Sequence, residues 1–204
     1  MDKPLQNLLG GRLAVDFANL GRVFSSGTAR PLTWTTLLTF LEAAKVVSAE
    51  RVSTLLPLLQ TDAASADNLL ALAARLQSAL RAGFAALAHG SHIPRESADV
   101  INEILRVTEG HDELVRDQGT WRLEFVAREN SPEWLLAAIA RSAAEIVADS
   151  QHSRLRLCAN PACGLLFCDT SRTGKRRWCS MATCGNRHKV AAFARRHSQK
   201  HAGA

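Results

Sequence analysis

The sequence predicts an α+β protein, mainly α, in which a helical N-terminal domain with a small β-hairpin precedes a small cysteine-rich finger. Apolar residues recur at helical spacing over most of residues 33–149, and one Gln-Gly turn signal interrupts them. All five cysteines lie after residue 157. With 204 residues, 47% of them apolar, the chain can bury a sizeable core and form one ordinary domain plus a small module.

The first apolar segment, residues 13–18, predicts a β-strand. It is short and mostly apolar, with two glycines before it and Asn19 after it. Asp16 and Asn19 lie in or beside this predicted strand. We expect these two polar side chains to cap a turn or to anchor the next loop, since nothing around them suggests a catalytic set.

Helical periodicity dominates the chain from residue 33 to residue 149. Apolar residues recur at i, i+3, i+4 and i+7, and alanine, the best helix former, is abundant in the longest run. Proline removes a helical hydrogen bond, so we expect the second helix to be interrupted near Pro57. Ser131 before Pro132 is typical of a helix start, with serine as the N-cap. The five predicted helices begin at Thr33, near Ser48, at Asp67, at Pro94 and at Ser131, and the last three end near His89, Arg106 and Asp149.

A β-hairpin and a linker complete the predicted N-terminal part. The Gln-Gly pair at 118–119 separates two partly alternating runs, which is typical of a hairpin turn. Residues 150–154 are the predicted linker. We therefore expect a mainly helical domain over residues 1–150, suited to sensing or dimerisation, and a separate finger with a basic terminal helix over residues 154–200.

Positive charge is confined to the C-terminal finger. Residues 154–204 contain eleven lysines and arginines and a single acid, Asp169, which gives this part a net charge of +10. The first 153 residues hold 14 basic and 18 acidic residues, a net charge of −4, so that the whole chain carries +6. A basic patch on an otherwise ordinary protein is typical of contact with nucleic-acid phosphates.

The N-terminus and the distribution of the cysteines predict a cytoplasmic protein. Residues 1–4 are not followed by an apolar signal segment, and no stretch approaches the roughly eighteen apolar residues of a membrane helix. A secreted disulfide scaffold would spread its cysteines, whereas the first 157 residues contain none. A metal-bound cluster in a reducing compartment fits better, with working disulfides as the alternative.

Two C-x4-C pairs predict one closed zinc site. The first pair is Cys158 and Cys163, and the second is Cys179 and Cys184. Four thiolates fill the tetrahedral shell of a structural zinc, so we expect one structural Zn²⁺ and no catalytic metal. A knuckle, the predicted strand 165–168 and a helix that begins near the last ligand are typical of a treble-clef or zinc-ribbon-like finger. So small a module depends on its metal, since zinc binding contributes about 10–16 kcal/mol.

Two further residues near the cysteine pairs, Cys168 and His188, could bind metal but are not expected to do so. Cys168 is a rival ligand, but a free cysteine in the middle of a strand packs as a small hydrophobe, so we expect it in the core. His188 is not needed as a ligand when four cysteines are available. Residues 169–177 predict a polar hairpin loop, from which Trp178 returns into the core.

The finger resembles the CGNR zinc-finger family over residues 179–187, supported by residues 167–171 and 177–178. In these bacterial proteins the finger follows an ABATE domain, which residues 13–19 also resemble. The resemblance implies a transcription regulator that binds DNA, and an RNA-binding function has also been suggested for the family. The zinc ligands that it implies are Cys158, Cys163, Cys179 and Cys184.

Basic side chains of the finger are the candidate nucleic-acid contacts. On the terminal helix Lys189 and Arg196 share one face, whereas Val190, Phe193 and His197 form the predicted packing face. A helix with one packed and one basic face is suited to a phosphate backbone or a groove. The candidates are Arg172, Lys175, Arg176, Arg177, Arg187, Lys189, Arg195 and Arg196.

Two residues of the Cys-Gly-Asn-Arg motif have local alternatives. Arg187 can contact a phosphate or a base edge, or it can pair with Asp169 and fasten the helix to the preceding loop, and both interpretations stay open. Asn186 is expected to bond to nearby backbone rather than to a base.

Three functions fit these features. A DNA-binding regulator, as a homodimer that contacts two half-sites, is the first, and an RNA-binding protein is the second. RNA readers expose stacking aromatics, but Phe167, Trp178 and Phe193 are all expected in the core, which favours DNA. A zinc-stabilised protein-interaction module is the third. An enzyme is not expected, because four thiolates close the metal shell.

Overall fold

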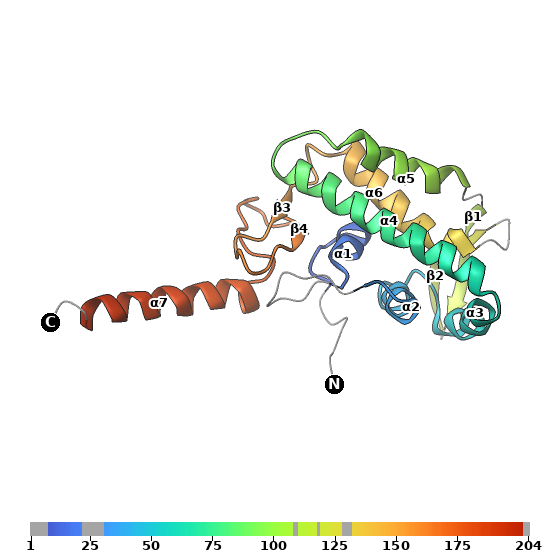
Figure 1. The fold of residues 1–204 in the computed structure, drawn as a ribbon, viewed down its shortest axis with the longest axis horizontal. Coiled ribbons are helices and arrows are strands. Elements are labelled where there is room, and N and C mark those ends of the chain that lie inside the picture. The colour runs from blue at the N-terminus through green and yellow to red at the C-terminus, as the bar shows by residue number, and fades with distance from the viewer. Residues whose placement is uncertain (1–7, 22–30, 108–109, 118, 128–131, 202–204) are drawn as a thin grey trace.

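The structure is a computed structural model that describes residues 8–21, 31–107, 110–117, 119–127 and 132–201. It is an α+β protein, mainly α, as the sequence predicts. Helices form one body, two short strands lie beside it, and the last helix extends away from both (Figure 1). The elements are α1 Leu13–Asn19, α2 Trp34–Ala43, α3 Ala49–Thr61, α4 Ala63–Ala88, α5 Arg95–Val107, β1 Gly110–Asp117, β2 Thr120–Ala127, η1 Pro132–Leu136, α6 Ala137–Ala148, β3 Leu155–Leu157, β4 Leu166–Cys168, η2 Met181–Gly185 and α7 Asn186–His201.

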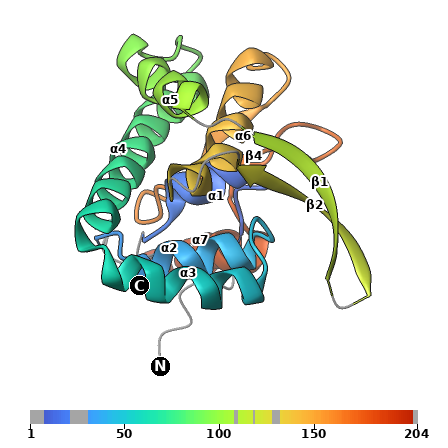
Figure 2. The same cartoon turned by 90° about the vertical axis from the view of Figure 1, so that its right-hand side faces the viewer.

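The segment predicted to be the first strand is a helix, α1, and that prediction is wrong. Four of its seven residues, Ala14, Val15, Phe17 and Ala18, are fully buried. The helix contacts α4, α6 and β4, so it has apolar residues on several faces and loses the one-sided pattern of a surface helix (Figure 2). A short apolar run does not distinguish a strand from a buried helix by periodicity alone.

The long helix α4 forms much of the wall around this buried helix. Its N-cap is Asp62, whose carboxylate accepts the Ser65 amide at 3.1 Å, so the helix begins four residues before the predicted start. It ends at Ala88 with His89 as its C-cap, and Gly90 follows with a φ of +77°, which suits glycine. The residues that α4 buries in the core are Ala66, Leu69, Ala73, Leu76, Leu80, Gly83 and Phe84.

The predicted interruption of the second helix at Pro57 is wrong, because α3 continues through Pro57 to Thr61. Proline at this position deprives the carbonyl of Ser53, four residues earlier, of its helical partner. Both Ser53 and Pro57 are exposed, so water can bond to that carbonyl at low cost.

The predicted hairpin is confirmed. Strands β1 and β2 pair antiparallel from Gly110–Ala127 to Asp117–Thr120, and Gly119 in the turn has a φ of +86°. The helix expected after it begins with the short 3-10 turn η1 and continues as α6. The predicted N-cap, Ser131, lies outside the described residues.

The two strands of the finger pack against the helical body. β3 pairs antiparallel with β4, and the buried residues Leu155, Leu166 and Cys168 belong to the same core as Phe17 and Leu136. α1 lies against β4, and α4 contacts β3 (Figure 1). The finger therefore shares an apolar core with the helices.

Candidate metal centre and the basic finger around it

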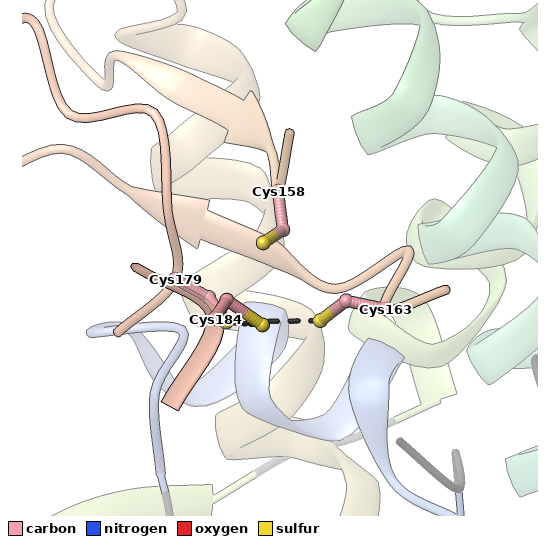
Figure 3. Close-up of side chains that lie close together, drawn as sticks. All are labelled: Cys158, Cys163, Cys179 and Cys184. Carbon is pink, nitrogen blue, oxygen red and sulfur yellow. Dashed lines mark hydrogen bonds between the residues drawn. The ribbon is translucent and has the colours of Figure 1, made fainter. Parts of the chain in front are cut away.

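Four cysteine side chains converge on one buried point. Cys158 follows β3 and Cys163 ends the first knuckle, whereas Cys179 precedes η2 and Cys184 lies within it (Figure 3). Their sulfurs all lie within 4.8 Å of one another, and all four residues are buried. The Cys163 and Cys179 sulfurs are 3.7 Å apart, and those of Cys179 and Cys184 are 3.8 Å apart.

These distances fit a tetrahedral zinc ion and not a disulfide. A Zn–S bond of about 2.3 Å places the sulfurs of a tetrahedral site about 3.8 Å apart. A disulfide would bring two sulfurs to about 2.05 Å, and all five cysteines are free thiols. The four cysteines thus form a closed site for one structural zinc, which supplies folding energy rather than a reactive position.

A hydrogen bond between Cys163 and Cys179 separates the pKa values of these two thiols. A hydrogen bond from the Cys179 thiol lowers the pKa of Cys163 to about 5, and the same bond raises the pKa of Cys179. Cys163 therefore loses its proton more readily than Cys179. A bound divalent cation stabilises four neighbouring thiolates and releases these protons.

Local hydrogen bonds shape the first knuckle around the sulfurs. The amide of Cys163 donates to the carbonyl of Asn160 at 2.9 Å, and Gly164 takes a φ of +60° to leave the turn. The Asn160 side chain donates to the Cys184 sulfur at 3.4 Å and accepts the Ala162 amide at 3.2 Å. One asparagine thus links the two cysteine pairs.

Cys168 and His188 lie apart from this cluster, as expected. Cys168 is only 6% exposed and belongs to the core shared with the helical body. The imidazole of His188 packs against the indole of Trp178, with ring centroids 4.8 Å apart. Neither residue is among the four that converge on the site.

The segment after residue 177 does not pair with β4 as the predicted hairpin requires. β4 pairs with β3, and the carbonyl of Arg177 accepts the amide of Ala159 at 2.8 Å beside the knuckle. Asp169 organises this loop. Its carboxylate accepts from the Ser171 hydroxyl at 2.6 Å and from the Arg176 amide at 2.8 Å. The sequence offered no strand signal after residue 177, so only the tertiary contact fixes where the loop closes.

Asp169 is also the buried ion-pair partner of Arg156, a residue for which the sequence predicted no function. The Arg156 guanidinium lies 3.4 Å from its carboxylate, and Asp169 is 2% exposed. Burial alone would raise the pKa of Asp169, but hydrogen bonds from Ser171 and Arg176 and the charge of Arg156 lower it overall. Arg156, and not Arg187, therefore holds the one acid of the finger among the described contacts.

The predicted basic residues divide into internal and exposed ones. The guanidinium of Arg176 donates to the carbonyls of Cys179 at 2.6 Å and Trp178 at 3.4 Å, and it stacks on Phe167. It therefore stabilises the finger from inside. Arg195 and Arg196 lie on α7 where side chains are outside the described structure. The exposed candidates are Arg172, Lys175, Arg177, Arg187 and Lys189.

The predicted packing face of the terminal helix is not buried. Val190 is 68% exposed and Phe193 is 58% exposed, since α7 projects away from the body (Figure 1). The His197 side chain lies outside the described structure. Asn186 behaves as expected, because its amide donates to the carbonyl of Ala182 at 3.3 Å.

A pair of hydrogen bonds from Asn19 joins the helical body to the finger. The side-chain amide donates to the carbonyl of Leu166 at 2.8 Å, and its oxygen accepts the Leu166 amide at 3.0 Å. The carbonyl of Gly10 accepts the amide of Cys168 at 2.8 Å. Arg81 extends the contact, since it donates to the carbonyls of Ala18 at 3.2 Å and Gly164 at 3.5 Å. Asn19 was expected to anchor a loop, and it instead holds a strand 147 residues away.

Asp16 fixes the position of Gly10, whose carbonyl bonds to the finger. The amide of Gly10 donates to its carboxylate at 2.7 Å. Burial raises the pKa of Asp16 from its ordinary value of 3.8 to about 6, although hydrogen bonds from Gly10 and Gly11 oppose the shift. The folded protein therefore holds more protons than the unfolded chain between about pH 4 and pH 6, so this group lowers stability as pH rises through that window.

Replacing Asp16 by asparagine is expected to remove this pH dependence. The free energy of unfolding of Asp16→Asn relative to the parent should increase by about 1–3 kcal/mol from pH 4 to pH 6 and then stay level. Urea unfolding of both proteins at pH 4, 5, 6 and 7 measures the difference, in which contributions from the thiols cancel. A difference that stays constant over this range contradicts the assignment.

The fold and the four-cysteine site define a mainly helical protein with a C-terminal structural zinc finger. Residues 11–150 match the ABATE family, described as a putative stress-induced transcription regulator. Because the match covers more than half of the chain, the protein belongs to the ABATE family. Residues 154–197 match the CGNR zinc finger, so both resemblances are confirmed. No curated protein matches the chain significantly.

The two families describe a zinc finger and a regulator, which are not enzymatic kinds of protein. Within the described residues, no helix combines the length and the apolar character needed to cross a membrane.

Proposed function

We propose that this protein binds nucleic acid through its finger and regulates transcription, with DNA as the main target and no catalytic activity of its own. The observation that supports the proposal is the position of the exposed cations. Arg172, Lys175 and Arg177 are exposed on the loop between the cysteine pairs, and Arg187 and Lys189 are exposed on the first turn of α7. Side chains of this kind are suited to a phosphate backbone.

In this proposal the zinc shapes the surface and the cations make the contacts. Cys158, Cys163, Cys179 and Cys184 are the ligands of the metal, which holds the loop and the start of α7 at one end of the protein. Residues 1–150 act as the sensing or dimerising part, and residues 154–200 as the binding part. A single small finger binds weakly, so a homodimer on two half-sites would strengthen the interaction, in a reducing cytoplasm that keeps the thiols free.

Binding to duplex DNA is expected to depend steeply on salt. If the five exposed cations each neutralise one phosphate, log Kobs should fall with log[salt] with a slope of about −4 to −5. The double substitution Arg172→Ala with Lys175→Ala should make the slope less steep, by about 2 units, because two phosphate contacts are lost. Fluorescence anisotropy with a labelled duplex measures both values between about 50 and 200 mM salt, where binding through several phosphates weakens by orders of magnitude.

The matched control is Arg95→Ala with Arg106→Ala, which removes the same charge from exposed positions on α5. This variant should keep the parent slope. An equal change in both variants would indicate a general charge effect, and no binding at the lowest salt would refute the proposal. The same measurement with RNA tests the alternative target, and binding of neither polymer would favour a protein-interaction module.

A further inference from the structure

A groove runs across the finger between the first knuckle and the start of α7. It has a volume of about 320 Å³, near the lower end of the range for small-molecule sites. One side is formed by small or apolar residues and the other by two aromatic side chains and an arginine. The residues that line it are Ala159, Asn160, Pro161, Ala162, Trp178, Arg187, His188 and Ala191.

The aromatic side of this groove is accessible, contrary to the expectation from the sequence. Trp178 packs against the cysteine cluster with one part of its indole, yet it is only half-buried and lines the groove. His188 is exposed and extends the indole, with the two ring centroids 4.8 Å apart and the planes tilted by 34°. The exposed imidazole of His188, with the indole packed against it, is an aromatic ring of the kind on which a nucleobase stacks.

The polar groups of the groove are suited to a phosphate rather than to the edge of a base. Arg187 is exposed and lines the groove, and the Arg177 guanidinium lies over the indole, 5.3 Å from the ring centroid. The amide of Asn160 is already used, since it donates to the Cys184 sulfur and accepts from Ala162. A ligand here would thus be held by stacking and by charge, with little selection among the four bases.

We infer that this groove binds one unpaired nucleobase, which stacks on His188, itself supported by Trp178, while Arg187 contacts its phosphate. This inference rests on the proposed function and names its preferred substrate class, single-stranded or locally opened nucleic acid. A base inside a duplex is stacked on both faces and cannot enter the groove. The protein should therefore bind a single strand more tightly than a duplex of the same sequence.

The test compares the holoprotein on three labelled probes of one sequence: single-stranded DNA, single-stranded RNA and duplex DNA. His188→Ala should weaken binding to single strands by about 5- to 100-fold, the loss expected for the stacking of one base, and leave duplex binding within about twofold. His188→Phe keeps an aromatic surface and should restore single-strand affinity. His92→Ala removes an exposed histidine from the helical body and should change nothing. One zinc per chain in each variant verifies that the finger is intact.

The possible results separate this inference from the proposed function. A preference for single-stranded DNA or RNA that His188→Ala removes supports the inference. The single strand that the protein binds more tightly identifies the preferred polymer. Equal binding of single strands and duplex, or an equal loss on both in His188→Ala, overturns the inference but leaves nucleic-acid binding in place. Binding to none of the three probes at low salt overturns both.

Discussion

Removing zinc from this protein is expected to destabilise the helical body as well as the finger. Zinc binding contributes about 10–16 kcal/mol to a small finger, which is comparable with the whole stability of an ordinary domain, about 5–15 kcal/mol. Without it β3 and β4 lose their support, and Leu155 and Leu166 leave the core that they share with α1. The body then loses apolar contacts and the partners of Asn19.

Hydrogen exchange measures this effect segment by segment. In Cys179→Ser, or after chelation of the metal, protection should fall in β3 and β4 and also in α1, which contacts β4. The bound zinc should drop from one per chain to substoichiometric levels. Thermal unfolding should shift downward as a single transition.

Cys168→Ala is the control for this experiment. Its thiol is buried in the shared core but outside the cluster, so one zinc per chain should remain and stability should fall by only about 1 kcal/mol. If Cys179→Ser unfolds residues 154–200 while α1 keeps its full protection, the finger is an independent unit and the shared core does not couple the two parts.

Replacing Asn19 by alanine is expected to loosen the finger from the opposite side. The substitution leaves the amide and the carbonyl of Leu166 without their partners, at 3.0 and 2.8 Å in the native protein. Each unsatisfied, partly buried group costs about 1–3 kcal/mol, so the free energy of unfolding should fall by about 2–4 kcal/mol. Zinc should also transfer faster to a competing chelator, because β4 lies between the two cysteine pairs.

Urea unfolding and the rate of zinc transfer to a coloured chelator measure the two effects. Asn68→Ala, an exposed asparagine on α4, is the matched control and should leave both unchanged. Asn19→Asp should give an intermediate result, since the carboxylate keeps the bond from the Leu166 amide and loses the bond to its carbonyl. A loss of stability below about 0.5 kcal/mol in Asn19→Ala would show that the contact with Leu166 does not couple the two parts.

Contacts between distant parts of the chain explain the predictions that failed. The segment of α1 is apolar on several faces because helices and β4 surround it, and a run of seven residues contains no periodicity that would indicate this. Val190 and Phe193 follow the spacing of a packing face, yet α7 projects away from the body and leaves them exposed. Arg176 has the same charge as its neighbours, and only the fold shows that its guanidinium bonds to carbonyls inside the finger.

What the sequence by itself determined is the metal chemistry and the position of the charge. Two C-x4-C pairs specify four thiolates within a short stretch, and the basic excess of the finger is a property of composition. Only the tertiary structure decided that the finger shares its core with the helical body, through Asn19, Gly10 and Leu166, and that Trp178 lines an open groove. Ligand spacing is local along the chain, whereas burial and accessibility depend on contacts between segments as far apart as Gly10 and Cys168.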